Sequence, residues 1–246
     1  CNRTRAVLLE SPGSLTMEVS DIPALAATAR GKGAAVLIDN TWASVAGFKS
    51  LAHGCDIAIE ALTKHVGGHS DLMMGACTAG PDWYFKLRLT AQQLGHVVSP
   101  DDAALALRGL RTLGVRLERE ATSALRIAEW LRGRAEVAEV LCPMLPGAQG
   151  HALWQRDFTG GCGLFSFVLA EGYDDAARSR FIDALELFGI GYSWGGFESL
   201  ATPVHAHRTA TRWPADRLAV RLSIGLEHPD DLIADLKRGF AAMGEY

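Results

Sequence analysis

The segments AAVLIDNTW (residues 34–42) and CDIAIEALTKHVGGHSD (residues 55–71) decide the fold class of this chain. Each begins with a nearly continuous apolar run and ends in polar residues, which is typical of a strand covered on both faces in a parallel sheet. RAVLLES (residues 5–11) and GACTAG (residues 75–80) predict further strands, and DIPALAATARGKG (residues 21–33) predicts a helix with an Asp cap and a Gly stop. The sequence therefore predicts an α/β unit with a mostly parallel sheet.

The second half of the chain has a different pattern. Helical periodicity extends from about residue 100 to residue 133, with Gly109 and Gly114 as candidate bends. Beyond it, helical patterns at residues 174–188 and 229–243 alternate with three strand-like runs, which are VAEVLCP (137–143), GLFSFVLAEG (163–172) and LAVRLSIGL (218–226). We predict that residues 1–133 are part of a large domain that includes a long connecting helix. Residues 134–246 are predicted to form a smaller C-terminal α+β domain.

Composition excludes several classes of protein. The chain has 246 residues, 48% of them hydrophobic, and a formal net charge of −4, so it is expected to be a folded, soluble protein. It has no cluster of Lys and Arg and no apolar run of about 18 residues, so neither a nucleic acid nor a membrane is an expected partner. The five cysteines are widely spaced without a C-x-x-C pair, which favours reduced thiols and a cytoplasmic location. An abrupt start on a strand-like run after Cys1 suggests a fragment, or residues upstream of this sequence.

Two charged residues follow neighbouring predicted strands. Asp39 ends AAVLID, and Lys64 follows CDIAIEAL, so both lie where open α/β sheets bind ligands. An amine and a carboxylate in one crevice suit pyridoxal 5′-phosphate, because the amine can form a Schiff base while the carboxylate keeps the pyridine nitrogen protonated. Thr63 and the glycines at 67 and 68 add a hydroxyl and close backbone packing. From spacing alone, the alternative is that Asp39 begins a turn and Lys64 is a solvated loop residue.

Four longer motifs carry a resemblance to a known family. LIDNTWAS (37–44), ALTKHVGGHSD (61–71), RGLRTLGVRLERE (108–120) and YSWGGFESLATP (192–203) together closely resemble the Cys/Met-metabolism family of pyridoxal phosphate enzymes, and the match covers essentially the whole chain. The resemblance implies part of the large domain of the aspartate aminotransferase-like, pyridoxal phosphate-dependent transferase fold, followed by a smaller C-terminal domain. It also implies that the aromatic residue stacking on the cofactor and the phosphate-binding glycine turn lie upstream of this region.

The resemblance assigns roles to residues by position. Lys64 matches the Schiff-base lysine, which also removes the Cα proton, and Asp39 matches the partner of the pyridine nitrogen. Thr63 matches a hydroxyl that contacts the phosphate, whereas Ala61 stands where many members have a second hydroxyl.

The substrate side of the site is implied in the same way. Ser193 and Arg221 match the residues that hold the α-carboxylate of the substrate, a task that suits the bidentate Arg fork. Trp194 is expected to line the substrate pocket, with simple packing as the alternative. Without the resemblance, Arg221 would be interpreted as an edge-strand or salt-bridge residue.

The resemblance also implies an activity. YSWGGFESL and WQRDFTGGCGLFSFVL (154–169) look most like the β-lyases of the family, which implies cleavage of the thioether amino acid L-cystathionine to homocysteine, pyruvate and ammonia. The alternatives are a γ-lyase or γ-synthase activity, or a catalytically silent fragment. Members of the family are typically homotetramers built from dimers that share active sites, so a homo-oligomer is expected.

No metal is expected. His65 and His69 have the spacing of two zinc ligands on a helix, but the two glycines between them argue against a helix. Cys162 is interpreted as a small packed residue rather than a reactive thiol.

Overall fold

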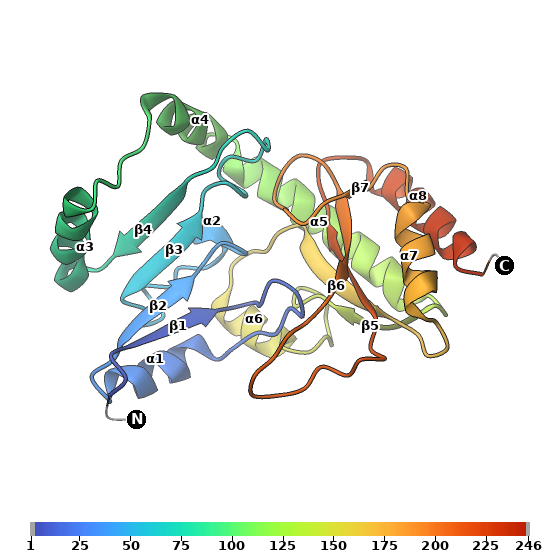
Figure 1. Cartoon of the computed structure of the whole chain (residues 1–246), viewed down its shortest axis with the longest axis horizontal. Helices are drawn as coiled ribbons and strands as arrows, with labels where there is room; N and C mark the ends of the chain where they lie inside the picture. The colour runs from blue at the N-terminus through green and yellow to red at the C-terminus, as the bar shows by residue number, and fades with distance from the viewer. Residues whose placement is uncertain (1–2, 245–246) are drawn as a thin grey trace.

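The computed structural model describes residues 3–244, which fold around two sheets (Figure 1). The first sheet has the order β1-β2-β3-β4, with β1, β2 and β3 parallel and β4 antiparallel to β3. The bounds of its strands are β1 (Ala6–Glu10), β2 (Ala35–Asp39), β3 (Ile57–Ala61) and β4 (Gly75–Ala79). All four strands were predicted, and the structure confirms the α/β fold with a mostly parallel sheet.

Helix α1 (Ile22–Arg30) connects β1 to β2 and covers one face of the first sheet. Its first turn is capped by the side chain of Asp21, which accepts a hydrogen bond from the amide of Ala24 at 3.2 Å. Val36 and Ile38 of β2 are fully buried, but Leu8 of β1 remains 67% exposed. Part of the opposite face is therefore open in the described residues, although the apolar pattern predicted cover on both faces. Such a pattern shows that a strand can be buried but does not supply the element that buries it.

The second sheet has the order β5-β6-β9-β8-β7. Its pairs are antiparallel except for the parallel pair of β7 and β8. The bounds are β5 (Val137–Leu141), β6 (Leu164–Leu169), β7 (Gly189–Ile190), β8 (Leu200–Val204) and β9 (Ala219–Ser223). Helices α7 (Asp175–Asp183) and α8 (Pro229–Ala242) pack against each other, and α7 contacts β8.

The predicted connecting helix is two helices, α4 (Pro100–Leu110) and α5 (Leu113–Arg132). The break lies at residues 111–112, so Gly109 and Gly114 are inside the helices rather than at the bend. Helix α5 contacts β5, β6 and α8, and crosses the middle of the molecule in Figure 1. The division at residue 133 stays a prediction. Three helices were not predicted, which are α2 (Ser44–Gly47), α3 (Pro81–Gln93) and α6 (His151–Asp157).

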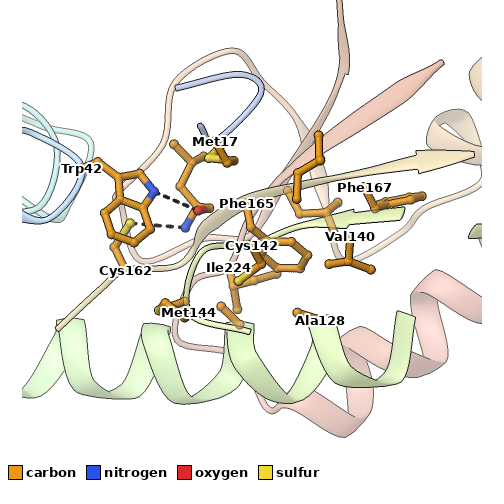
Figure 2. Packing of buried hydrophobic residues seen from close by; sticks show 14 of the residues in the cluster. Met17, Trp42, Ala128, Val140, Cys142, Met144, Cys162, Phe165, Phe167 and Ile224 are labelled. Atoms are coloured by element: carbon orange, nitrogen blue, oxygen red, sulfur yellow. Dashed lines mark hydrogen bonds between the residues drawn. The ribbon is translucent and has the colours of Figure 1, made fainter. Parts of the chain in front are cut away.

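A continuous apolar core joins the two sheets. Figure 2 shows Trp42, from the loop after β2, beside Cys162, with Phe165 and Phe167 of β6 farther along and α5 running along one side. The indole nitrogen of Trp42 donates a hydrogen bond to the carbonyl oxygen of Leu164 at 3.0 Å. The loop that leaves Asp39 is thereby tied to the second sheet. None of the helices within residues 3–244 combines the length and apolar character needed to span a membrane.

Candidate active site

Lys64 lies in a tight turn just after β3. The amide of Lys64 donates to the carbonyl oxygen of Ala61 at 3.0 Å, and the carbonyl oxygen of Lys64 accepts from the amide of Gly68 at 2.8 Å. Gly68 has a φ of +70°, and a Cβ there would lie 2.0 Å from the guanidinium of Arg116. Only glycine fits this position without rearrangement, because both the backbone angle and the neighbouring cation exclude a side chain.

The amine of Lys64 points to a second loop, between β7 and β8. The Nζ of Lys64 donates a hydrogen bond to the Oγ of Ser193 at 2.8 Å, and it lies 5.4 Å from the centre of the Trp194 ring. Burial lowers the pKa of Lys64, and the positive charge of Arg221 lowers it further. A lowered pKa increases the share of neutral amine at a given pH, and the neutral form is the one that acts as a base or nucleophile.

A cleft opens beside the loop that Lys64 contacts, although neither Lys64 nor Arg221 is among its lining residues. Its volume is about 730 Å³, which is in the range of small-molecule sites. Thr63, Ser193 and Trp194 line it. Its other lining residues are Ser70, Asp71, Leu72, Met73, Gly189, Ile190, Gly191, Tyr192, Gly196, Glu198 and Leu200. Trp194 both lines the cleft and packs edge-on against His65, with 5.3 Å between the ring centres.

Arg221 lies on β9, which is a central strand paired with β6 and β8. The edge-strand interpretation is therefore wrong. The residue is buried, and its guanidinium forms no ion pair with any residue in the described range 3–244. It donates to the backbone oxygens of Tyr192 at 2.6 Å and Ser14 at 3.2 Å. Because an arginine has five N–H donors, the cation retains donors for a further acceptor.

Asp39 and Thr63 lie at the same edge of the first sheet as Lys64. Asp39 is the last residue of β2 and is in register with Ile59 of β3, and its carboxylate accepts from the amide of Thr41 at 2.9 Å. The hydroxyl of Thr63 donates to the carbonyl oxygen of Met74 at 3.2 Å and accepts from its amide at 3.0 Å. Within residues 3–244, no hydrogen bond or ion pair joins Asp39 to Lys64. Asp39 also does not line the cleft.

The histidine pair and the cysteine that the sequence singles out are placed as follows. His65 and His69 are in the turn after β3 and not on a helix, and no group of three or more potential metal ligands gathers anywhere in residues 3–244. Cys162 is buried, and burial raises the pKa of its thiol well above the ordinary value. Its surroundings are those of a packed core residue.

The side chains at this edge of the first sheet and in the facing loop fit pyridoxal phosphate. A lysine amine of lowered pKa faces a hydroxyl, a buried guanidinium lies close enough to perturb that amine, and a carboxylate ends the neighbouring strand. This chemistry can bind an aldehyde covalently and hold a carboxylate. The α/β fold and this set of side chains are those of a pyridoxal phosphate-dependent enzyme.

Comparison with known proteins gives the family. The family model for Cys/Met metabolism PLP-dependent enzymes matches residues 1–241, and the chain belongs to this family. A putative cystathionine beta-lyase of Rhizobium johnstonii is 50% identical over 98% of this chain and 62% of its own length. The cystathionine beta-lyase MetC of Escherichia coli is 46% identical over 97% of this chain and 62% of its own length.

Solved structures agree with this assignment. The structure of cystathionine gamma synthase from Xanthomonas oryzae pv. oryzae, in complex with aminoacrylate and cysteine, matches with a TM-score of 0.87 and 37% identity. The match covers 97% of this chain and 63% of that one. The chain thus spans about 62% of the length of the curated relatives it matches.

Several residues of the site were not predicted from the sequence. Tyr192, Met73 and Glu198 line the cleft. Tyr192 and Glu198 lie within the motif YSWGGFESLATP but were not singled out, and Met73 belongs to none of the quoted motifs. A buried contact between His65 and Glu120 was also missed. A signal for it existed, because Glu120 interrupts an otherwise apolar stripe on α5 that includes Leu113, Leu117 and Ala124.

Proposed function

We propose that this chain is the catalytic part of an enzyme that cleaves the carbon–sulfur bond of L-cystathionine by β-elimination. The products would be homocysteine, pyruvate and ammonia. The observation that carries the proposal is the amine of Lys64, whose pKa is lowered and which donates a hydrogen bond to Ser193. Ser193 and Trp194 line a cleft of suitable size. The similarity to cystathionine beta-lyases over nearly the whole chain supports the choice of substrate and bond.

The substrate's α-carboxylate is proposed to bind Arg221 and Ser193. The guanidinium of Arg221 is buried, so an ionic hydrogen bond to a carboxylate there is stronger than in water. The proximity of Arg221 to Lys64 then places the α-carbon of the substrate near the amine. We propose that the neutral Nζ of Lys64 takes the proton from this carbon, which its lowered pKa favours.

Three residues are proposed to hold pyridoxal phosphate, which are Lys64 through its amine, Asp39 at the pyridine nitrogen and Thr63 at the phosphate. When bound, the cofactor supplies an electron sink for the charge that develops at the α-carbon. Asp39 would keep the nitrogen protonated, because a carboxylate favours the charged form of a neighbouring base. Ala61 offers no hydroxyl at the position where many family members have one.

The second candidate is γ-elimination or γ-replacement, which the likeness to a cystathionine gamma synthase supports. β-Elimination and γ-elimination begin with the same proton transfer at Lys64. The two differ in the keto acid formed from L-cystathionine, which is pyruvate after β-elimination and 2-oxobutyrate after γ-elimination.

The deciding experiment incubates the protein with pyridoxal phosphate and L-cystathionine and identifies the keto acid, with Lys64→Ala as the control. We expect pyruvate from the parent chain and none from the variant. Predominant 2-oxobutyrate would favour the second candidate. No keto acid at all would contradict the proposal and favour a chain that is catalytically silent by itself.

We also propose a cytoplasmic location, a homotetramer of dimers that share active sites, and a domain boundary near residue 133. The location is supported by Cys55, Cys142 and Cys162, which are buried and unpaired as expected in a reducing compartment. Light scattering after size-exclusion chromatography tests the assembly, for which we expect about four times the chain mass of 26.4 kDa.

A further inference from the structure

Two ionisable side chains, His65 and Glu120, are buried together behind the cleft. The Nδ1 of His65 lies 3.6 Å from the Oε2 of Glu120 on α5, and the two side chains are 2% and 1% exposed. Neither this nitrogen nor either carboxylate oxygen of Glu120 has a hydrogen-bond partner within the described residues. Buried polar atoms without partners are costly, so the charge state of this pair needs an explanation.

The protons of the pair can be counted from its neighbours. The Nε2 of His65 lies 3.2 Å from the carbonyl oxygen of Trp42. A carbonyl oxygen only accepts, so Nε2 carries a hydrogen and donates it. The other nitrogen faces Glu120, and a lone pair facing an ionised carboxylate would be repulsive. A hydrogen on Nδ1 or on the carboxyl group of Glu120 would remove this repulsion.

The surrounding charges favour placing this proton on His65. Arg116 lies one turn before Glu120 on α5, is itself buried, and interacts electrostatically with Glu120. Its Nη2 donates to the carbonyl oxygen of Gly109 at 2.9 Å. A nearby guanidinium stabilises an ionised carboxylate, and an ionised Glu120 in turn stabilises an imidazolium. The other titratable groups close to the pair are Lys64 in the same turn, Glu60 on β3 and Cys162 before β6.

His65 is also the contact point between the two loops of the cleft. It is next to Lys64 in the chain, and its ring packs edge-on against Trp194. A Cβ at Gly195 would lie 3.1 Å from the Nδ1 of His65 and 3.1 Å from the Cβ of Lys64. The 193–195 loop therefore packs against His65. On its other side the imidazole contacts Glu120 and the carbonyl oxygen of Trp42.

We propose that His65, as an imidazolium paired with Glu120, is a positioning residue that fixes Trp194 and the 193–195 loop relative to the amine of Lys64. The role of this geometry in turnover rests on the proposed function. The charge state and the contact with Trp194 do not, and they can be tested without cofactor or substrate.

The first test is the fluorescence of Trp194 in the cofactor-free protein at neutral pH. The chain has six tryptophans. The Trp194 signal of the parent, or of any variant, is therefore its fluorescence minus that of the same protein carrying the additional substitution Trp194→Phe. An imidazolium quenches a neighbouring indole, whereas a neutral imidazole quenches it weakly. Glu120→Gln keeps the shape of the pair but removes the charge that stabilises the imidazolium.

We expect the Trp194 signal to rise in Glu120→Gln and in His65→Gln. His69→Asn is the matched control, because His69 is exposed in the same turn and can keep its contact with the carbonyl oxygen of Gly67. The control should leave the signal unchanged. Suppose that circular dichroism shows Glu120→Gln to be folded. An unchanged Trp194 signal in this variant would then overturn the proposal that His65 is an imidazolium.

The second test measures turnover of L-cystathionine with saturating pyridoxal phosphate. We expect His65→Leu to lower kcat by about 10- to 100-fold, the cost of displacing catalytic groups by about 1 Å, with a smaller change in KM. His65→Gln keeps a donor for the carbonyl oxygen of Trp42 and should recover part of the loss. Parent-like kcat in His65→Leu would overturn the positioning role. An inactive parent chain would contradict the proposed function. The fluorescence test would still show whether His65 is an imidazolium beside Glu120.

Discussion

Asp235 on α8 is predicted to be a major source of stability for the segment that leads into the cleft. The side chain is buried, and its Oδ2 accepts from the amides of Leu187 at 2.8 Å and Phe188 at 3.2 Å. Its Oδ1 accepts from the amide of Glu186 at 3.0 Å. These three amides lie just before β7, and the loop that follows β7 carries Ser193 and Trp194. One carboxylate thus anchors α8 to this segment.

The expected cost of Asp235→Asn follows from these bonds. Asparagine keeps one acceptor oxygen, which can face the amides of Leu187 and Phe188. The amide of Glu186 and the guanidinium of Arg238 then lose the acceptor Oδ1, so two hydrogen bonds to a charged oxygen are lost, each contributing about 1.5 to 3 kcal/mol. The free energy of unfolding should fall by about 3 to 6 kcal/mol, a large share of a typical stability of about 5 to 15 kcal/mol.

Urea denaturation followed by circular dichroism measures this loss. Asp231→Asn is the matched control, because Asp231 lies on the same helix but is exposed, and its cost should stay within about 0.5 kcal/mol. A loss below about 1 kcal/mol in Asp235→Asn, similar to the control, would show that Asp235 does not anchor this segment.

Three further predictions concern glycines, the lysine and the thiols. Gly109→Ala should lower stability by about 1 to 3 kcal/mol, because the new Cβ would lie 2.0 Å from a backbone oxygen of the Lys64 turn. Gly114→Ala has open space and should raise stability by up to about 1 kcal/mol in the same urea assay; equal effects would contradict this. Because the pKa of Lys64 is lowered, its labelling by an amine reagent in the cofactor-free protein should reach half its maximum at a lower pH than that of the exposed lysines, as peptide mass spectrometry would show; a higher midpoint would be evidence against it. The exposed Cys77 should react with a thiol reagent in the native protein while Cys142 should not, because burial raises the pKa of Cys142 to about 12; rapid labelling of Cys142 would contradict the buried assignment.

The strands of the first sheet could be predicted because apolar runs such as residues 34–39 are short and bounded by polar residues. Helix α3 was missed because none of its residues is buried, so it has no apolar stripe. Strand β8 was missed because Pro203 lies within it, and proline in an apolar run argues against a strand. The break between α4 and α5 falls at residues 111–112, where neither residue is a helix breaker, so tertiary packing decides it.

The candidate site was predictable only in part. Asp39 and Lys64 each follow a strand of one parallel sheet, so topology alone places them at the same edge. Ser193 lies 129 residues from Lys64 and in a loop, so no local pattern could bring the two together, and only the family resemblance singled it out. The apolar stripe of α5 marks Glu120 as a buried exception, but its pairing with His65 depends on the packing of α5 against the Lys64 turn, which no periodicity specifies.

Mapping the site of cofactor attachment shows whether Lys64 is the lysine that binds pyridoxal phosphate. The protein is incubated with pyridoxal phosphate, reduced with borohydride, digested and analysed by mass spectrometry. We expect a pyridoxyl adduct on Lys64, absent from Lys64→Ala and far in excess of any adduct on the exposed Lys49 or Lys237. Equal labelling of these lysines, or no adduct on Lys64, would contradict this role of Lys64.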